Sequence, residues 1–351
     1  MSDSIEQLIA IDLGNGVTSY IAGNGAKGSF ASLVSEAKGT QGLGAGFARE
    51  AFKLKDGSYY VGDDCREAGA VVRSTDSSYY SSTEIRVLFL KVLKEVSVKN
   101  PIIVTGLPTE FFNSHRDEFA ATLKRWALDE GYQPTKIQIL PQYAGPWFDP
   151  ELLDESGNKV DPSFVLKGKI AIADIGYGTS DFGQFDNGRV SDLRYGESLG
   201  VSDIHKTLFT QLANPDSLND LIKSPKSKLP KDFRLDLQTS VFTMDKWLRD
   251  GAIPWRGEMI PIEPISLPAR TKFADDVLPR AIKTLWGSTD FLNGFIFAGG
   301  GSMVLGTELL KKHIFTKILR AADPENSVVR GFYRFYVTQF FKTHAVVQHG
   351  R

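Results

Sequence analysis

The sequence predicts an α/β protein built from two similar domains, each a mixed β-sheet with flanking helices, with a cleft between them. The length supports two domains, because 351 residues exceed what one ordinary core accommodates. A short motif (Asp, an apolar residue, Gly, any residue, Gly, then hydroxyl residues) occurs at residues 12–18 and again at residues 174–180. Strand-like and helix-like segments also alternate twice along the chain, as in a duplicated α/β fold.

Each copy of the motif lies in an expected β-meander. Residues 7–14 read as a buried strand, Asn15-Gly16 as a hairpin turn and residues 17–23 as the returning strand. The second copy opens a three-stranded meander from residue 169, with a further turn at Asp186-Asn187-Gly188. Each half of the chain therefore starts with the same strand arrangement.

Helices are expected between and after the meanders. Residues 82–96 have an apolar face at helical spacing, and residues 114–131 begin with a Ser cap and stop at a glycine. Residues 100–112 between them read as a strand that runs into a Gly-Pro turn. In the second half, helices are expected at 202–213, 240–250, 273–286 and 307–322, and a strand that ends in glycines at 295–302.

Four segments carry Gly, Pro and polar residues without regular periodicity, and we expect them to be irregular: 36–50, 149–164, 213–234 and 260–270. The segment at 149–164 is the natural boundary between the halves. Residues 23–28 match Gly-x-Gly-x-x-Gly, but a poor helix follows them. A loop between two strands is therefore favoured there over a dinucleotide-binding turn.

Composition and charge exclude several classes of function. The net charge of −1 gives no field that would draw the chain to nucleic acid or to an anionic membrane. The single cysteine, Cys65, cannot form an internal disulfide, which fits a reducing compartment, and the expected location is the cytoplasm. Histidine spacing does not suggest a zinc site, and the common phosphate-binding loop with Gly-Lys-Ser/Thr is absent from the sequence.

The repeated motif has the chemistry of a phosphate-binding turn. Glycines let the backbone N–H groups approach an anion, and the hydroxyl side chains can donate to the same anion. An aspartate at the end of the preceding strand, Asp12 or Asp174, is placed to hold a hydrated Mg²⁺ that accompanies the phosphates. Two such turns, one from each half, could clamp a single polyphosphate from both sides.

Taken together, these segments resemble the actin-like ATPases, the superfamily of actin, sugar kinases and heat-shock chaperones. "IDLGNGVTS" is similar to the first phosphate loop of that superfamily, "IADIGYGTSDF" to the second and "IFAGGGSMVLG" to the adenosine motif. "ILPQYAGPWFD" and "PENSVVRGFYRF" are similar to the two connecting helices, although Ser327 and Val328 replace the usual Ala-rich pair. The strand that ends in Thr-Gly-Leu-Pro is most similar to the ParM or StbA type of prokaryotic actin.

The resemblance implies two duplicated actin-like (ribonuclease H-like) domains with a nucleotide cleft between them. The first would comprise residues 1–165 and 324–351, with a small inserted subdomain at about 30–80, and the second residues 166–323. The C-terminal tail is expected to be a helix packed on the first domain.

The resemblance also implies roles for individual residues. Asp12 and Asp174 would bind Mg²⁺ through water, Asp174 would help to polarise the attacking water, and Gln142 would orient that water. The nucleotide, ATP with GTP as the alternative, would be contacted by Gly14, Asn15, Gly16, Thr18, Gly176, Gly178, Thr179, Ser180, Asp203, Lys206, Gly299, Gly300, Gly301 and Ser302.

Structural roles remain as alternatives for these residues. The glycines could be ordinary hairpin glycines, and Asp12 and Asp174 could cap turns. Gln142 could cap the helix after Pro141. Asp203 and Lys206 read better as an exposed pair on one helix than as nucleoside ligands.

The function implied by the resemblance is a slow, Mg²⁺-dependent ATPase that polymerises into dynamic filaments. Its partners would be further copies of itself and an adaptor protein bound to DNA or other cargo, without direct contact to nucleic acid or membrane. A monomeric small-molecule kinase of the same fold and a cell-shape filament are the alternatives. A membrane-attached relative would need an amphipathic tail with a clean basic face, which the C-terminus lacks.

Overall fold

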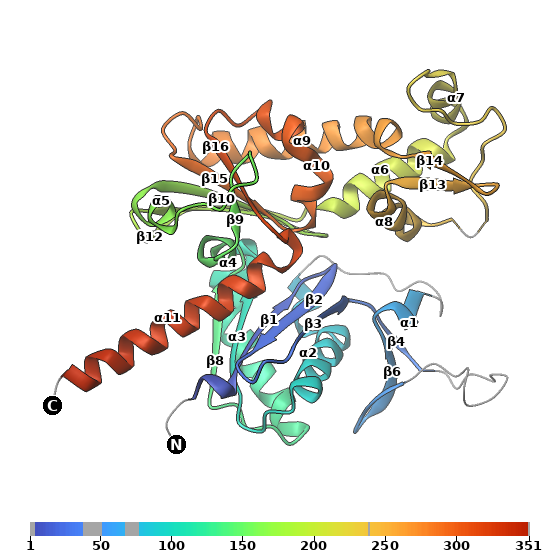
Figure 1. Ribbon diagram of the computed structural model, residues 1–351. Helices are drawn as coiled ribbons and strands as arrows, with labels where there is room; N and C mark the ends of the chain where they lie inside the picture. The colour runs from blue at the N-terminus through green and yellow to red at the C-terminus, as the bar shows by residue number, and fades with distance from the viewer. Residues whose placement is uncertain (1–3, 38–50, 67–76, 238, 350–351) are drawn as a thin grey trace.

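Two β-sheets organise the chain, one in each half (Figure 1), and the computed structural model describes residues 4–37, 51–66, 77–237 and 239–349. The first sheet has the strand order β3-β2-β1-β7-β8. Its central strand β1 pairs antiparallel with β2 and parallel with β7. The bounds are Leu8–Leu13 for β1, Val17–Ala22 for β2, Lys27–Ala31 for β3, Ile102–Leu107 for β7 and Lys136–Pro141 for β8.

The second sheet repeats this arrangement, in the order β12-β11-β10-β15-β16-β9. Its central strand β10 is antiparallel to β11 and parallel to β15, as β1 is to β2 and β7. The prediction of an α/β fold with two similar mixed sheets is therefore confirmed. The bounds are Leu152–Leu153 for β9, Lys169–Ile175 for β10, Ser180–Asp186 for β11, Arg189–Glu197 for β12, Gly294–Ala298 for β15 and Lys317–Ala321 for β16.

Helices cover both faces of the first sheet, which explains why all six residues of β1 are apolar or buried. Ile9 packs in one cluster with α2 (Thr83–Val96) and α3 (Thr109–Asp129). Ala10 faces the other way and packs with α11 (Ser327–His349). The prediction that the C-terminal tail is a helix packed on this sheet is confirmed as far as Phe340, because Tyr336, Val337 and Phe340 belong to the same cluster.

Helices likewise cover both faces of the second sheet. Ala171 and Ala173 share an apolar cluster with the helices on one face, and Ile170 and Ile172 share another cluster with those on the opposite face. The first group is α6 (Val201–Ala213), α8 (Val241–Asp250), α9 (Glu263–Leu285) and α10 (Gly300–Lys311), and the second is α4 (Ala144–Phe148) and α5 (Pro162–Lys167).

Smaller elements extend the two halves away from the sheets (Figure 1). A three-stranded sheet, in the order β4-β6-β5, lies in the segment predicted as an inserted subdomain, and a two-stranded hairpin, β13-β14, extends the second half. Their bounds are Val34–Glu36 (β4), Phe52–Leu54 (β5), Gly57–Val61 (β6), Ala252–Trp255 (β13) and Glu258–Pro261 (β14). The remaining helices are α1 (Asp63–Arg66), α7 (Pro215–Lys223) and the 3₁₀ turns η1 (Ile5–Gln7), η3 (Ser77–Ser81) and η4 (Pro324–Asn326).

The two halves are joined where α4 crosses α11. α4 packs on the second sheet and α11 on the first, so this crossing connects them. Two glycines let the helices touch: a Cβ on Gly331 would lie 1.8 Å from the carbonyl oxygen of Gly145. Arg330 of α11 adds a bidentate pair to the buried Asp149, with N–O distances of 3.0 and 2.6 Å. The small residues at the crossing are therefore Gly145 and Gly331, while Val328 is buried against the first sheet.

Two predicted helix starts are wrong. α3 begins at Thr109 and not at Ser114, whose hydroxyl donates to the Phe111 carbonyl oxygen inside the helix. The reason is the preceding proline, which needs no N–H partner and has a φ of −53° that suits a helix start. α9 begins at Glu263, so much of the segment 260–270, predicted as irregular, is helical.

Two other segments also differ from the prediction. Residues 213–234 contain α7, which is capped by the Asn214 side chain and begins with a proline, a combination that favours a helix start. Residues 307–322 do not form one helix: α10 ends at Lys311, and β16 follows and fills the position between β15 and β9. Most of the segment 36–50 lies outside the described residues.

The predicted turns are present, with one difference. Asn187 and Gly188 have φ values of 47° and 78°, as the Asn-Gly turn requires. Asn15 and Gly16 also connect two antiparallel strands, but neither has a positive φ, because the loop there is longer than two residues. Residues 23–28 connect β2 with β3 and continue into the latter, as expected for a loop between strands.

The domain boundaries stay a prediction. β9 pairs with β16 and α5 packs in a cluster of the second sheet, although β9 precedes residue 166 and α5 begins before it. In the part of the chain that the structure describes, no helix has the length and apolar character that crossing a membrane requires.

The α4–α11 crossing yields a stability prediction. Gly331→Val should lower the free energy of unfolding by about 3 kcal/mol, because any Cβ at this position collides with the backbone of α4. Urea unfolding measures the change. Arg334→Val, at an exposed position of the same helix, is the matched control and should change the free energy by less than about 0.5 kcal/mol. Equal effects of the two variants would contradict the tight crossing.

Candidate nucleotide site

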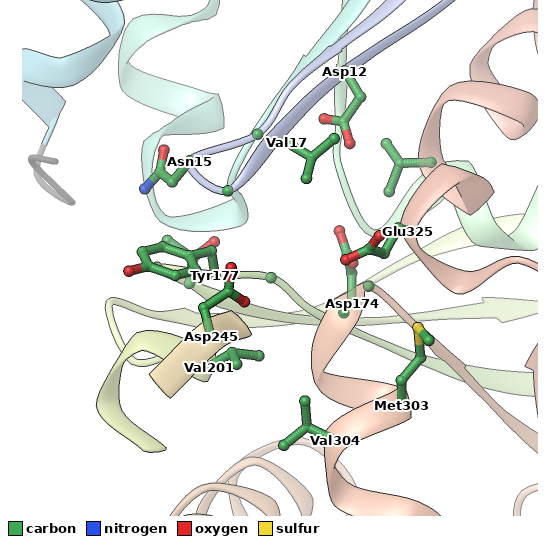
Figure 2. Close-up of a pocket in the computed structure, with 18 of the residues that line it drawn as sticks. Asp12, Asn15, Val17, Asp174, Tyr177, Val201, Asp245, Met303, Val304 and Glu325 are labelled. Atoms are coloured by element: carbon green, nitrogen blue, oxygen red, sulfur yellow. The ribbon is translucent and has the colours of Figure 1, made fainter. Parts of the chain in front are cut away.

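The two copies of the motif form facing loops on either side of one cavity. The first loop follows β1 and the second follows β10, so each leaves the end of a central strand. The loops touch, because a Cβ on Gly16 would lie 2.8 Å from the Cβ of Tyr177. Both loops line the cavity shown in Figure 2. The fold therefore brings together two segments that are far apart in the sequence.

Asp12 and Asp174 point into this cavity from the ends of β1 and β10 (Figure 2). Both side chains are buried. Burial raises the pKa of Asp12 to about 7, a hydrogen bond from Gln142 opposes this, and the charge of Asp181 adds to it. Burial also raises the pKa of Asp174 well above its usual value, and the negative charges of Asp12 and Asp181 raise it further. A bound cation would therefore stabilise the two carboxylates in their ionised form.

Asp181 is a third buried carboxylate that the sequence reasoning missed. It lies opposite Asp174 in the β10–β11 ladder and accepts a hydrogen bond from the backbone N–H of Thr109, at the first turn of α3. Burial raises its pKa to about 6, although the bonds from Thr109 lower it. The strand pairing of the second meander was a signal that could have identified it. Asp181 therefore links the second sheet to a helix of the first half.

Gln142 lies beside Asp12, between β8 and α4. Its Nε2 donates to Asp12 Oδ1 at 3.0 Å, and the side chain is buried. With the amide nitrogen donating to Asp12, the amide oxygen is left to accept from another group. A water molecule is a suitable donor.

The structure brings eleven of the predicted residues to the cavity and leaves six away from its lining. Those that line it are Asp12, Gly14, Asn15, Gly16, Gln142, Asp174, Gly176, Gly178, Thr179, Gly299 and Gly300. Those outside the lining are Thr18, Ser180, Asp203, Lys206, Gly301 and Ser302.

These six residues make structural contacts of their own. Asp203 accepts from the N–H of Gly200 at the start of α6 and pairs with Lys206 at 3.2 Å. This is the exposed helix pair that the sequence favoured. The hydroxyl of Ser180 donates to the Leu199 carbonyl oxygen at 2.7 Å, and Thr18 and Ser302 are likewise buried in local hydrogen bonds. Gly301 allows α10 to pack on β10, since a Cβ there would lie 2.2 Å from Ile175.

Further residues that the sequence did not indicate complete the lining of the cavity. Arg249 of α8 pairs with Glu325 of η4 at 2.8 Å and with Asp245 at 3.0 Å. Leu248, Met303 and Val304 add apolar surface beside this network. Apolar surface with a few polar groups beside it suits a nucleobase and its sugar. Asp245 and Arg249 carry no sequence signal beyond their spacing of four residues on a helix.

The donor set at the loop end fits Mg²⁺. Asp12 and Asp174 are two oxygen donors whose mutual repulsion a cation would relieve. Among the described lining residues, Arg249 is the only lysine or arginine, and it is paired with Glu325. The described residues contain no cluster of three His, Cys, Asp or Glu side chains that could hold a metal ion. Waters and phosphate oxygens would therefore complete the coordination.

The raised pKa of Asp12 predicts how the stability of the free protein depends on pH. A folded pKa of about 7 exceeds the unfolded value of 3.8, so the stability this carboxyl contributes is lost as the pH rises through about 7. Between about pH 5 and about pH 8 the free energy of unfolding should fall by on the order of a few kcal/mol. The melting temperature should fall with it. Asp12→Asn should reduce this dependence, to which the raised pKa values of Asp174 and Asp181 also contribute, and should stabilise the free protein at the higher pH.

Thermal unfolding without nucleotide or Mg²⁺ measures this dependence. Asp192→Asn, at an exposed position of β12, is the matched control and should retain the wild-type slope. A wild-type melting temperature that rises with pH, or an equal slope in Asp12→Asn, would show that Asp12 is not held near neutrality.

Comparisons with known proteins agree with this geometry. Residues 10–139 match the family described as "Actin like proteins N terminal domain". A search of curated protein sequences finds no match. Among solved structures, a 15-stranded ParM filament from Clostridium botulinum aligns with a TM-score of 0.65 and 21% identity, over 95% of this chain and 99% of that one.

Two further structures show the same fold. A non-polymerisable quadruple mutant of pCBH ParM aligns with a TM-score of 0.66 and 20% identity, over 94% of this chain and 99% of that one. The archaeal actin homolog Ta0583, in complex with ADP, aligns with a TM-score of 0.57 and 16% identity, over 95% of this chain and 99% of that one. The chain therefore has the actin-like fold seen in prokaryotic actin homologues, and its residues 10–139 match the N-terminal domain of actin-like proteins.

Proposed function

We propose that the protein is a cytoplasmic, Mg²⁺-dependent ATPase that assembles into dynamic filaments, and that an adaptor protein couples these filaments to plasmid or other DNA. The observation that carries the proposal is the convergence of both loops with Asp12, Asp174 and Gln142 in one cavity. The ADP complex of Ta0583 and the ParM filament from Clostridium botulinum support the nucleotide and the self-association, respectively.

The chemistry proposed for the loop end is hydrolysis of the γ-phosphate. The backbone N–H groups of the two loops would bind the phosphates. Asp12 and Asp174 would hold Mg²⁺ through water molecules, and the ion would supply positive charge there. The amide oxygen of Gln142 accepts from the attacking water, and Asp174 polarises it. Such a site acts by alignment and electrostatics and not by covalent catalysis. Since the first loop contains no lysine, we expect slow turnover, as a filament that uses hydrolysis as a timer requires.

Assembly and hydrolysis test this proposal together. The wild-type protein should pellet and scatter light with Mg²⁺ and ATP, and less with ADP or without nucleotide; a parallel GTP sample tests the choice of base. Asp174→Ala should keep measurable ADP binding but lower phosphate release by at least about 100-fold, since it removes the side chain next to the attacking water.

Asp192→Ala, an exposed carboxylate on the same meander, is the control and should release phosphate at the wild-type rate. Undiminished phosphate release by Asp174→Ala would show that the proposed site is wrong. A wild-type protein that never assembles and transfers phosphate to a metabolite would instead be a small-molecule kinase.

Arg249 is proposed to help bind the nucleoside. Arg249→Ala should weaken ADP binding roughly 10- to 100-fold, because it removes a cationic donor and leaves Asp245 and Glu325 without their shared partner. Isothermal titration measures the affinity. Lys246→Ala, on the same helix but paired only with Asp250 among the described residues, is the matched control and should bind ADP normally. Equal affinity of the two variants would place the nucleoside elsewhere.

A further inference from the structure

The side chain of Tyr80 lines the nucleotide cavity and has a hydroxyl with no role in the fold. Tyr80 lies in η3, only 6% of the residue is exposed, and its side chain forms part of the cavity wall. No hydrogen bond joins this hydroxyl to another residue in the described part of the chain. An enclosed hydroxyl without a partner lowers the stability of a protein, and phenylalanine would fill the same space without this penalty. The free donor therefore indicates that a bound ligand supplies the acceptor.

Three neighbouring rings hold the phenol of Tyr80 in place. Its ring centroid lies 5.5, 6.0 and 5.7 Å from those of Tyr79, Phe111 and Phe119, respectively. The contacts with Tyr79 and Phe119 are edge-to-face, an arrangement that aromatic rings prefer. η3 is also joined to α2, because the N–H of Ser82, the N-cap of that helix, donates to the Tyr79 carbonyl oxygen at 3.0 Å. The hydroxyl is therefore presented from a fixed position, as a binding group requires.

The Tyr80 hydroxyl lies near the buried carboxylates of the site. Burial raises the pKa of Tyr80 well above its usual value. Further contributions come from Tyr79 and from the negative charges of Asp181, Asp12 and Asp174. The phenol therefore keeps its proton at neutral pH and is a donor without a charge of its own. Two of these three carboxylates, Asp12 and Asp174, are those proposed above to hold Mg²⁺ through water.

An anionic phosphate is the acceptor that suits this position. Phosphate oxygens carry negative charge, so a hydrogen bond from a phenol to such an oxygen is stronger than one between neutral groups. Mg²⁺ held by Asp12 and Asp174 would bring phosphates to this part of the cavity. Gln142 donates to Asp12 at 3.0 Å, and its amide oxygen is proposed to accept from the attacking water. The phosphate next to these groups is therefore the terminal one, which that water attacks.

We propose that the Tyr80 hydroxyl donates a hydrogen bond to the terminal phosphate of ATP and so makes the site prefer ATP to ADP. This inference rests on the proposed function and adds a third segment, η3, to the two loops that contact the phosphates. With ADP the acceptor is absent and the bond cannot form. Release of the terminal phosphate thus removes a contact to the turn that precedes α2.

Tyr80→Phe removes the hydroxyl and keeps the ring, so it tests the hydrogen bond directly. Competition with a fluorescent ADP derivative measures the affinities for ADP and for the non-hydrolysable β,γ-imido analogue of ATP, both with Mg²⁺, at a protein concentration that gives no pellet. The variant should bind the analogue roughly 10- to 100-fold more weakly than the wild-type protein does, and ADP equally well. Its melting temperature without nucleotide should equal or exceed the wild-type value, since the hydroxyl has no protein partner to lose.

Tyr79→Phe is the matched control, because Tyr79 belongs to the same group of rings but is not among the residues that line the cavity. It should bind both nucleotides with wild-type affinity. Three results for Tyr80→Phe would overturn this inference and leave the proposed function intact: unchanged affinity for the analogue, whatever the rate of phosphate release; equal weakening for both nucleotides; or a lowered melting temperature. A wild-type protein that binds neither nucleotide would overturn the proposed function itself.

Discussion

The burial of three carboxylates, Asp12, Asp174 and Asp181, in one small region is the constraint on which the rest of the structure depends. Each lies at or beside the end of a central strand, and each has a raised pKa because water is excluded and like charges face one another. A fold selected for stability alone would not keep such a cluster. The surrounding structure therefore has to hold the carboxylates together against their repulsion, in a cavity that a cation and an anionic ligand can complete.

Two contacts hold them together. At the first, Gly145 and Gly331 let the backbones of α4 and α11 touch, and this fixes the crossing that joins the two sheets. On the other side, the N–H of Thr109 donates to Asp181, so the first turn of α3 stabilises a negative charge that belongs to the second sheet. The first contact is steric and the second is electrostatic. The second weakens when Asp181 is protonated, because a neutral carboxyl accepts a weaker hydrogen bond than a carboxylate.

The sequence predicted the fold class and identified the two loops that meet at the cavity, because both depend on local patterns. The repeated Asp-x-Gly-x-Gly motif and the strands around it identify Asp12 and Asp174, and both line the cavity. The pair of Arg249 and Glu325 in the cavity lining could not be predicted, since the two residues come from distant elements that meet only after folding. Predicted helix boundaries were wrong next to prolines, because a proline ends a helix in one context and starts it in another.

The hairpin β13–β14 has a further consequence for how copies of the chain can associate. Both of its strands are edges of a two-stranded sheet, yet Pro254 and Pro261 have no N–H to offer to an additional strand. Backbone pairing with another chain, the route by which exposed edges grow into amyloid-like aggregates, is therefore blocked at these positions. Contacts on this surface are left to side chains, whose interactions can be broken as readily as they form.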